Sequence, residues 1–563
     1  MKTVIIGGVA GGATAAARLR RLDENAEIVI FERSGFVSYA NCGLPYYVGG
    51  VIEEEKNLTL QTPQSFWARF RIDVRVHHEV TAIDPAGKTV TVKNLETGEI
   101  FQESYDKLIL SPGARPVRPN LEGTENERIF TLRTVEDTLR LRRFAEEEKP
   151  ETAVIVGGGY IGLEMAENLC EIGLSVTMIQ RPKQLLSPLD EDMAAFLHAK
   201  FRQKGVRLML GCTVEGFAEE QGKVSVRLQD GQLLHADMVL LAIGVTPDTK
   251  LAKDAGLTLG IKDSIVVNDR METSAPDIYA VGDAVEVRHF ITGEKALISL
   301  AGPANKQGRI AADNICGGDS RYLGSQGSSV IKAFDLTVAT TGISEKAARK
   351  AGIDCDAVIL SPVSHASYYP GGKAMTMKVV YERGTLKLLG AQIVGYDGVD
   401  KRIDVLATAM HAGLTAVQLK DLDLAYAPPY SSAKDPVNMA GFMIENIACG
   451  RVKQFRWEEI RELPDDGRIT RLDTRTPEEY ARGHVAGFIN IPVDVLRDHL
   501  DEIPREKPVY VMCQSGVRSY ISCCILSQNG FDCYNFAGGY RFYETVELEK
   551  VAAESTWPCG IEK

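Results

Sequence analysis

The chain has 563 residues, enough for roughly three or four domains with buried cores. Its 64 Lys and Arg against 76 Asp and Glu give a net charge of −12, which does not favour nucleic acid as a partner. A content of 44% hydrophobic and 25% charged residues excludes disorder and fibres. No apolar run reaches the roughly 18 residues of a membrane span, and eleven cysteines are too few for a disulfide scaffold. We therefore expect a cytoplasmic globular protein with reduced thiols and no membrane partner.

Two stretches have the strand, glycine-rich turn and helix of a dinucleotide-binding unit. They are KTVIIGGVAGGATAAARLRRL, followed by AEIVIFE, and TAVIVGGGYIGLEMAENLCEIG, followed by SVTMIQ. In the second, Gly157, Gly159 and Gly162 complete a G-x-G-x-x-G pattern. The first glycine forms the tight turn, the second admits a pyrophosphate and the third lets the helix pack on the strand. Because the pattern recurs far from the N-terminus, we interpret the first apolar run as a strand and not as a secretory signal.

The first unit departs from this pattern at one position. Gly7 and Gly12 hold the outer places, but a valine holds the middle one. Glu32 ends the next strand, where an acidic side chain can bind the ribose hydroxyls of an adenosine. The matching residue of the second unit is Gln180, followed by Arg181, which leaves the choice between NADH and NADPH open. Two dinucleotide sites in one chain predict two cofactors that exchange electrons, and FAD with a nicotinamide is the economical pair.

Three further stretches resemble the flavoprotein disulfide reductases with two dinucleotide-binding domains, over roughly residues 1–450. TSAPDIYAVGDA is similar to the second flavin motif of that family, which implies that Asp283 holds the ribityl chain of FAD. YDKLILSPGARP and MVLLAIGVTPDT resemble its two crossover strands. Tyr160 matches a side chain that covers the flavin until the nicotinamide arrives, with ordinary packing as the alternative. The resemblance also implies cofactor contacts at Arg33, Ala114 and Ala301.

A single cysteine stands where glutathione-reductase-like relatives carry a C-x-x-x-x-C pair. The stretch FVSYANCGLPYY holds Cys42 alone, and Val37 occupies the position five residues earlier, so no disulfide can form within this turn. It resembles the single-cysteine branch, which comprises NADH oxidases, peroxidases and coenzyme A disulfide reductases. A lone cysteine beside a flavin can cycle through a mixed disulfide or a sulfenic acid. We expect positive charge or a helix dipole to stabilise its thiolate; the alternative is a buried, inert cysteine.

Two features favour the coenzyme A branch over the oxidases and peroxidases. Those enzymes carry a His in the first glycine loop, where this chain has Ala10, so peroxide chemistry lacks its acid–base partner. The next helix carries Arg18 and Arg21, which can hold the 3′-phospho-ADP of coenzyme A, although a solvated helix face is the alternative. The resemblance implies further coenzyme A contacts at Thr14, Ser38, Asn41, Arg71 and Asn305.

Two later segments resemble motifs of the same subfamily. HASYYPGG implies that Tyr368, or else Tyr369, approaches the substrate sulfur. LAYAPPYSSAKDPVNMAG implies that Tyr426 and Lys434 reach the active site of the partner subunit. A phenol can donate a proton to a departing thiolate, and a Lys can hold phosphate as a point charge. The resemblance therefore implies an obligate homodimer with shared active sites.

A second candidate sulfur site lies near the C-terminus. Cys513 follows the strand PVYVM and precedes a helix, in a loop whose inward N–H groups can stabilise a thiolate or a persulfide anion. The pairing of this cysteine with Arg518, which adds charge at the rim, resembles the C-x5-R loop of a tyrosine-type phosphatase, although only four residues separate the two here. The stretch LDTRTPEEYARGHVAGFINIPV resembles instead the scaffold signature of rhodanese domains, in which we interpret His484 as structural. That signature includes Asp473, Arg475 and Glu478, and the loop comprises Gln514, Ser515, Gly516, Val517, Arg518 and Ser519.

The remaining cysteines of this region suggest no separate chemistry. Cys523 and Cys524 are adjacent on the next helix and Cys533 follows closely. Packing is favoured for them, and a resolving thiol is the alternative. No Cys/His spacing suggests a zinc site.

These patterns predict an α/β protein with two Rossmann-like domains for FAD and NAD(P)H, an α+β dimerisation domain and an α/β rhodanese domain. The expected ranges are 1–112 with 275–324 for FAD, 113–274 for NAD(P)H, 325–450 for dimerisation, 451–466 for a linker and 467–553 for rhodanese.

The whole chain resembles fusions of coenzyme A disulfide reductase with rhodanese. This resemblance implies that NAD(P)H, through FAD and Cys42, reduces persulfides, polysulfides and coenzyme A disulfide to hydrogen sulfide and thiol. Cys513 would accept sulfane sulfur, and coenzyme A, as bound cofactor or substrate, would carry it between the cysteines. The alternative is thiol redox balance through coenzyme A disulfide, with the rhodanese domain as a sensor or docking module.

Overall fold

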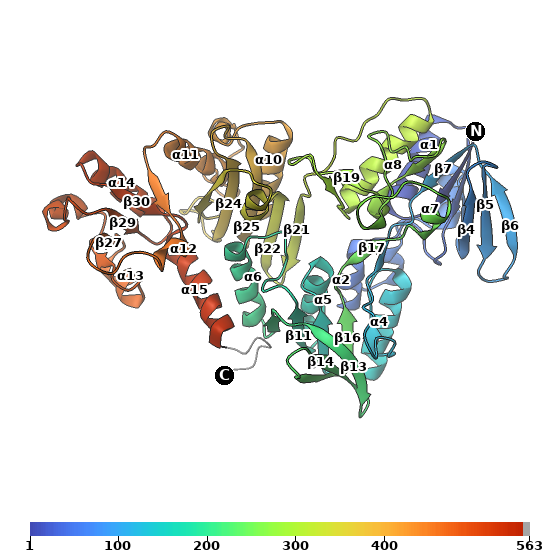
Figure 1. Ribbon diagram of the computed structural model, residues 1–563, viewed down its shortest axis with the longest axis horizontal. Helices are drawn as coiled ribbons and strands as arrows, with labels where there is room; N and C mark the ends of the chain where they lie inside the picture. The colour runs from blue at the N-terminus through green and yellow to red at the C-terminus, as the bar shows by residue number, and fades with distance from the viewer. Residues whose placement is uncertain (556–563) are drawn as a thin grey trace. The chain divides into compact units, whose positions relative to one another are not determined.

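The computed structural model describes residues 1–555, which fall into two units (Figure 1). The first combines residues 1–183 and 205–327, and the second combines residues 184–204 with the chain from Ser328 onward. Residues 184–204 lie inside the range predicted for the NAD(P)H domain, yet they group with the second unit. Among the described residues, no helix is long and apolar enough to cross a membrane.

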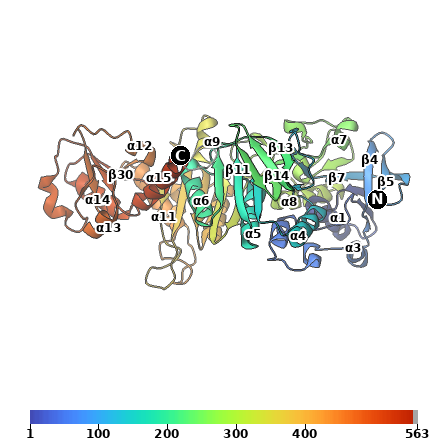
Figure 2. The same ribbon diagram turned by 90° about the horizontal axis from the view of Figure 1, so that it is seen from below.

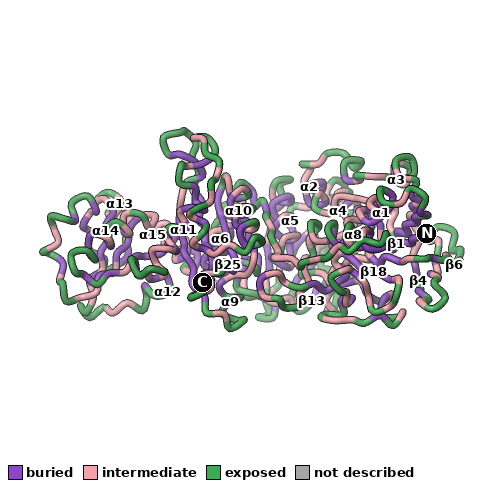
Figure 3. Tube along the Cα trace, turned by 90° about the horizontal axis from the view of Figure 1, so that it is seen from above, coloured by how far each residue is buried: buried purple, intermediate pink, exposed green. Residues whose placement is uncertain are grey.

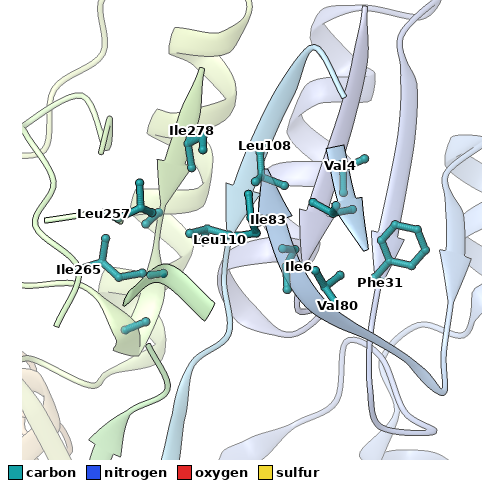
Figure 4. Packing of buried hydrophobic residues seen from close by; sticks show 14 of the residues in the cluster. Val4, Ile6, Phe31, Val80, Ile83, Leu108, Leu110, Leu257, Ile265 and Ile278 are labelled. Carbon is teal, nitrogen blue, oxygen red and sulfur yellow. The ribbon is translucent and has the colours of Figure 1, made fainter. Parts of the chain in front are cut away.

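The first sheet of the first unit is parallel, in the order β18-β7-β1-β2-β3. Its sequences, such as KTVII and EIVIF, are almost continuously apolar because both faces of the sheet are covered. Figure 4 shows Val4, Phe31 and Leu108 in the core on one face. The elements are β1 (Lys2–Ile6), α1 (Ala10–Leu22), β2 (Glu27–Phe31), α3 (Pro63–Phe70), β3 (Asp73–Arg75), β7 (Lys107–Leu110), β18 (Ile278–Ala280) and α8 (Ala301–Ile315).

A second parallel sheet of the same unit has the order β12-β11-β10-β16-β9. The two predicted crossover stretches contribute β8 and β17, which pair with each other as antiparallel strands. The elements are β8 (Ala114–Pro116), β9 (Ile129–Phe130), α4 (Val135–Glu148), β10 (Thr152–Val156), α5 (Tyr160–Glu171), β11 (Ser175–Gln180), β12 (Arg207–Leu210), β16 (Met238–Leu241), β17 (Val245–Pro247) and α7 (Lys250–Asp254).

Smaller antiparallel sheets complete the first unit. They comprise β4 (His78–Asp84), β5 (Thr89–Asn94) and β6 (Ile100–Ser104); β13 (Val214–Glu220), β14 (Lys223–Leu228) and β15 (Leu233–Ala236); and β19 (Val287–Arg288) with β20 (Lys295–Ala296).

The second unit contains an antiparallel sheet in the order β21-β22-β25-β24-β23. All residues of β25 are buried, as the purple trace in Figure 3 shows. The elements are α6 (Glu191–Gln203), β21 (Ser329–Ala333), β22 (Leu336–Gly342), α9 (Glu345–Lys350), β23 (Cys355–Leu360), β24 (Met375–Glu382), β25 (Leu388–Gly395), α10 (Val399–His411) and α11 (Pro436–Ala448).

The C-terminal part of the second unit is a parallel sheet, β26-β30-β29-β27-β28, with helices around it (Figure 2). β26 lies inside the predicted linker, which therefore contributes a strand to this sheet. The elements are β26 (Lys453–Phe455), α12 (Trp457–Ile460), β27 (Thr470–Asp473), α13 (Pro477–Arg482), β28 (Ile489–Asn490), β29 (Val509–Met512), α14 (Val517–Gln528), β30 (Cys533–Phe536) and α15 (Gly539–Ser555).

A buried charge cluster joins α6, α9 and β24 within the second unit. The ammonium of Lys378 lies 3.1 Å from Asp190, 2.8 Å from Asp192 and 3.0 Å from Glu345. These carboxylates raise the pKa of Lys378 despite its burial. Buried charges of this kind are tolerated only when they are paired.

Replacing Lys378 by Met should therefore leave Asp190 and Asp192 buried without their cation, whereas Glu345 keeps its pairing with Arg456. We expect a loss of about 3–5 kcal/mol, seen as a fall of roughly 10 °C in the melting temperature of the second unit in calorimetry. Lys373→Met is the control, because Lys373 is exposed next to β24. An unchanged melting temperature for Lys378→Met would show that the cluster does not contribute to stability.

Candidate active sites

A cavity of about 410 Å³ lies at the carboxyl end of β1, as expected for a ligand site in a parallel α/β sheet. Glu32 lines this cavity and is largely buried. Its carboxylate accepts hydrogen bonds from the N–H groups of Gly8 at 2.8 Å and Ser34 at 3.0 Å. Burial nevertheless raises the pKa of Glu32. Each oxygen keeps a lone pair for a ribose hydroxyl, the role predicted for this residue.

The glycine turn beside this cavity fits a dinucleotide. A Cβ on Gly7 would lie 2.1 Å from the carbonyl oxygen of Ser111, and one on Gly12 would lie 1.9 Å from that of Gly7. Gly7 also has φ +93°, which favours glycine. Asn41 lines the cavity, and its buried Oδ1 has no hydrogen-bond partner within the described chain. Of the other predicted flavin contacts, Arg33 and Ala114 line the cavity, whereas Ala301 is exposed at the start of α8.

The second glycine loop has the same construction. A Cβ on Gly157 would lie 2.3 Å from the carbonyl oxygen of Ala242, whereas one on Gly159 would meet no atom within 4 Å. That open space is where the pattern predicts a pyrophosphate. Gln180 accepts a hydrogen bond from the N–H of Gly158 at 3.0 Å, as Glu32 does from Gly8. The second loop is thus closed by a neutral amide and the first by a carboxylate.

Cys42 lies in a short 3-10 helix, η1 (Asn41–Gly43), directly before α2 (Leu44–Val48). Its side chain is exposed. α2 packs against α5, the helix that follows the second glycine loop. The approach is close, because a Cβ on Gly49 would lie 2.0 Å from Oδ1 of Asn168. This packing brings Cys42 into the electrostatic range of Glu164 on α5.

The sequence predicted positive charge or a helix dipole that stabilises the Cys42 thiolate, but the surroundings of Cys42 disfavour its thiolate. Although the side chain is exposed, the surrounding protein partly desolvates the thiol. This desolvation, then the carboxylate of Glu164, raises the pKa of Cys42, and Arg133 opposes them. Arg133 also pairs with Asp283 at 2.7 Å. Burial, assisted by Glu167, raises the pKa of Glu164 to about 7. Sequence reasoning missed Glu164, although its place one helical turn after Tyr160 was a usable signal.

Half of the residues predicted to bind coenzyme A lie on α1 and α8. Thr14 donates a hydrogen bond to Asn305 at 2.8 Å. Arg18 is engaged by Asp313 at 2.6 Å, and the guanidinium of Arg21 lies 5.7 Å from the ring of Phe70. Arg18 is therefore already paired with a carboxylate, which a phosphate would have to displace or share. The other four stand apart from these helices. Arg71 is stacked on Trp67, and the N–H of Ser38 donates to the carbonyl oxygen of Gly8. Asn41 lines the nucleotide cavity, and Lys434 lies just before α11 in the second unit.

In the second unit, Tyr368 and Tyr426 meet through their hydroxyl groups, which share a short hydrogen bond. Both side chains are exposed. The hydrogen bond to Tyr368 raises the pKa of Tyr426. The fallback candidate, Tyr369, packs edge-on against His365, with ring centroids 5.5 Å apart. The pairing of the two predicted phenols therefore favours Tyr368 over Tyr369.

Cys513 is fully buried at the end of β29, where the chain turns into α14. Its sulfur accepts hydrogen bonds from the N–H of Gly516 at 3.1 Å and the hydroxyl of Ser519 at 3.2 Å. The N–H of Tyr540 donates to the carbonyl oxygen of Cys513 at 2.7 Å and holds the loop from behind. This arrangement supplies two donors for an anionic sulfur.

The scaffold of this loop depends on two arginines. Arg475 is buried, pairs with Asp473 at 2.7 Å and donates to the side chain of Gln514 at 3.2 Å. Arg518 is held by both oxygens of Glu479, at 2.6 and 2.8 Å, which lowers the pKa of Glu479 to about 2. Arg518 is thus paired and not a free charge at the rim.

Other scaffold residues also differ from expectation. Glu478, predicted for the scaffold, is exposed, and its neighbour Glu479 makes the contact with the loop. The ring of His484 stacks on that of Tyr480, with ring centroids 3.9 Å apart. This contact suits a structural role. Cys523 and Cys533 lie in the hydrophobic core behind the loop, with the Cys533 sulfur 3.4 Å from the Cys523 carbonyl oxygen.

Comparison with protein-family models matches this architecture. Residues 1–308 match the pyridine nucleotide-disulphide oxidoreductase family, and residues 328–436 match its dimerisation domain. The chain belongs to this family. Residues 457–544 match a rhodanese-like domain. The predicted fold class and the predicted combination of an oxidoreductase with a rhodanese are confirmed.

The similarity to three known proteins covers most of the chain. A coenzyme A disulfide reductase of Staphylococcus aureus (strain JH9) is 38% identical over 442 residues, 78% of this chain and 99% of that protein. The crystal structure of reduced Bacillus anthracis CoADR-RHD is 47% identical, with a TM-score of 0.95, over 97% of this chain and 98% of that one. An NAD-dependent persulfide reductase from A. fulgidus is 38% identical, with a TM-score of 0.90, over 96% of this chain and all of that one.

The hydroxyl of Ser519 should increase the reactivity of Cys513 by donating to its sulfur. Removing it with Ser519→Ala should slow alkylation of Cys513 at pH 7 about tenfold, because a hydrogen bond to a charged group contributes roughly 1.5 kcal/mol or more. Mass spectrometry of the modified peptide measures the rate. Ser527→Ala is the control, because Ser527 is exposed on the same helix and its hydroxyl donates to the Cys524 carbonyl oxygen, away from Cys513. Equal rates in the two variants would contradict the assignment.

Proposed function

We propose that this oxidoreductase uses FAD and NAD(P)H to reduce persulfides, polysulfides and coenzyme A disulfide or persulfide to hydrogen sulfide and thiol. Cys42 would perform the reduction, and Cys513 would deliver sulfane sulfur. The observation that carries the proposal is the presence of two different nucleophilic thiols in one chain. Cys42 adjoins the nucleotide cavity through Asn41, and Cys513 lies among hydrogen-bond donors. Similarity to a persulfide reductase and to coenzyme A disulfide reductases supports it.

The two glycine loops divide the cofactors between them in this proposal. Gly7, Gly12, Glu32, Arg133 and Asp283 would hold FAD, and the loop closed by Gln180 would hold NADH or NADPH. When bound, these cofactors supply an electron pair for the sulfur of Cys42. The protein itself positions the reacting thiol, because the packing of α2 on α5 holds Cys42 beside the helix that follows the second glycine loop.

At Cys42 the proposed reaction is thiol–disulfide exchange. The Cys42 thiolate attacks the inner sulfur of R–S–SH, the donor S–S bond breaks, and HS⁻ departs with the electron pair. The mixed disulfide between Cys42 and R then takes up two electrons, which regenerates the Cys42 thiolate and releases R–S⁻. The linked phenols of Tyr368 and Tyr426, contributed by the partner subunit of a homodimer, would protonate the leaving sulfur.

Coenzyme A would act as the carrier, held by Thr14, Arg71 and Asn305 with the charge of Arg18 or Arg21. A chain with reduced thiols suits the cytoplasm, where we place the enzyme. A second candidate function is reduction of coenzyme A disulfide alone. The Staphylococcus aureus relatives favour it, because they are named coenzyme A disulfide reductases. As the match covers 99% of their length with 78% of this chain, they have no counterpart to the rest of it.

Exchanging each cysteine separately should distinguish the two functions. Cys513→Ser should lower polysulfide-dependent NAD(P)H oxidation at least tenfold and leave reduction of coenzyme A disulfide within twofold, because only the first needs sulfane delivery. Cys42→Ser should abolish both while the purified protein keeps its flavin absorbance. Unaltered polysulfide turnover in Cys513→Ser would exclude the sulfane function and leave coenzyme A disulfide reduction.

The carboxyl of Glu164 should make the reactivity of Cys42 depend on pH. Above its pKa of about 7 it is ionised and raises the pKa of the neighbouring thiol. Glu164→Gln removes this charge, so alkylation of Cys42 in the holoenzyme should be about threefold faster at pH 8. Near pH 5.5, where Glu164 is protonated, the variant and the parent should react alike.

The control for this experiment is Glu171→Gln, because Glu171 is exposed at the end of the same helix. It should alkylate at the parent rate at both pH values. A Glu164→Gln protein that reacts no faster than the parent at pH 8 would show that Glu164 does not act on Cys42.

A further inference from the structure

A cavity of about 460 Å³ lies next to the Cys513 loop, inside the second unit. The loop residues Ser515–Val517 line it from the rhodanese domain, and residues 360–362 line it from the range that matches the dimerisation domain. Helix α11, which follows that range, adds Met439, Phe442 and Met443. The spacing of these three residues, i, i+3 and i+4, puts them on one face of the helix. The surroundings of the rhodanese loop are therefore built from two domains.

The apolar residues of this cavity are unusually exposed for their size. Phe442 on α11 is 38% exposed and Val517 on the loop is 50% exposed. Large apolar side chains that line a concave site beside a nucleophile are typical of the part of a ligand site that contacts the apolar body of a ligand. A bare inorganic sulfur donor has no such body.

Two of the polar groups that line the cavity indicate what else the ligand carries. The carboxylate of Glu445, also in the lining, is already paired with Lys420. Asn535 at the end of β30 lines the cavity and is 7% exposed, and its buried Oδ1 has no hydrogen-bond partner within the described chain. An unpaired buried amide oxygen is costly unless a ligand donates to it. Lys434, just before α11, also lines the cavity and is exposed. A donor group and an anionic end on the ligand would satisfy both.

We propose that this cavity binds the carrier of sulfane sulfur: an organic persulfide with an extended, largely apolar arm, an amide N–H and an anionic end. This inference rests on the proposed function, in which Cys513 accepts the sulfur. The Cys513 thiolate attacks the outer sulfur of R–S–SH, a new S–S bond forms at Sγ, and R–S⁻ leaves with the electrons of the broken bond. Helix α11 would thus set the specificity of the rhodanese domain toward long organic donors.

The test measures the first sulfur transfer alone, in the flavin-loaded protein without NAD(P)H. The donor is either 4′-phosphopantetheine persulfide, which has the arm, or thiosulfate, which lacks it; cyanide accepts the sulfur, and thiocyanate is measured. Met443→Trp, which fills the cavity, should lower kcat/KM for the persulfide about tenfold and leave thiosulfate within twofold. Phe442→Ala, at a partly exposed site that tolerates truncation, should raise KM for the persulfide about threefold.

Ala448→Trp is the matched control, because Ala448 is exposed at the end of α11 and outside the cavity lining. It should leave both donors at the parent rate. Equal losses for both donors, or no loss with the persulfide in either cavity variant, would overturn the assignment. Should Met443→Trp fail to fold, Phe442→Ala decides alone. Because this assay needs no reduction, it stays informative even if Cys513→Ser shows that polysulfide reduction does not pass through Cys513.

Discussion

The packing of α2 against α5 is the contact on which the first candidate site depends. α2 begins two residues after Cys42, and α5 begins one residue after Gly159 of the second glycine loop. Gly49 permits the approach, since any Cβ there would collide with Asn168. Protein interiors are close-packed and do not deform freely, so the helix pair fixes the position of the thiol relative to the second loop. A side chain at Gly49 would push α2 away from α5, and so separate the Cys42 thiol from Glu164 and from the second glycine loop.

The two thiols have opposite surroundings, which suits different tasks. Cys42 is exposed, with a carboxyl of tunable charge nearby that disfavours its thiolate. Cys513 is buried and receives two hydrogen bonds at its sulfur. Cys42 must attack the substrate as a thiolate, and the nucleophilicity of a thiolate falls as its pKa falls. A pKa that is not too low therefore suits this task. A sulfur that must hold a persulfide anion gains from fixed donors.

Local patterns in the sequence predicted the parts of the sites that are local in the chain. The glycine turns, Glu32 and the Cys513 loop follow from motifs within a few tens of residues. The remaining features depend on distant partners. Arg18 pairs with Asp313, 295 positions away, and the strand β26 finds its neighbour β30 across most of the rhodanese domain. The contact of α2 with α5 also arises only in the fold, which is why Glu164 was missed.

The predicted linker shows how such distant contacts bear on sulfur transfer. Arg456 within it pairs with Glu345 and Asp356 of the dimerisation domain and is largely buried. A buried guanidinium loses several kcal/mol of hydration if it leaves such partners unpaired. Together with β26, this pairing anchors the rhodanese sheet to the dimerisation domain. A domain held in this way cannot swing freely on a flexible tether. In the proposed function, a mobile small molecule would therefore carry its sulfur away. The cavity between the loop and α11 is where we propose that this molecule binds.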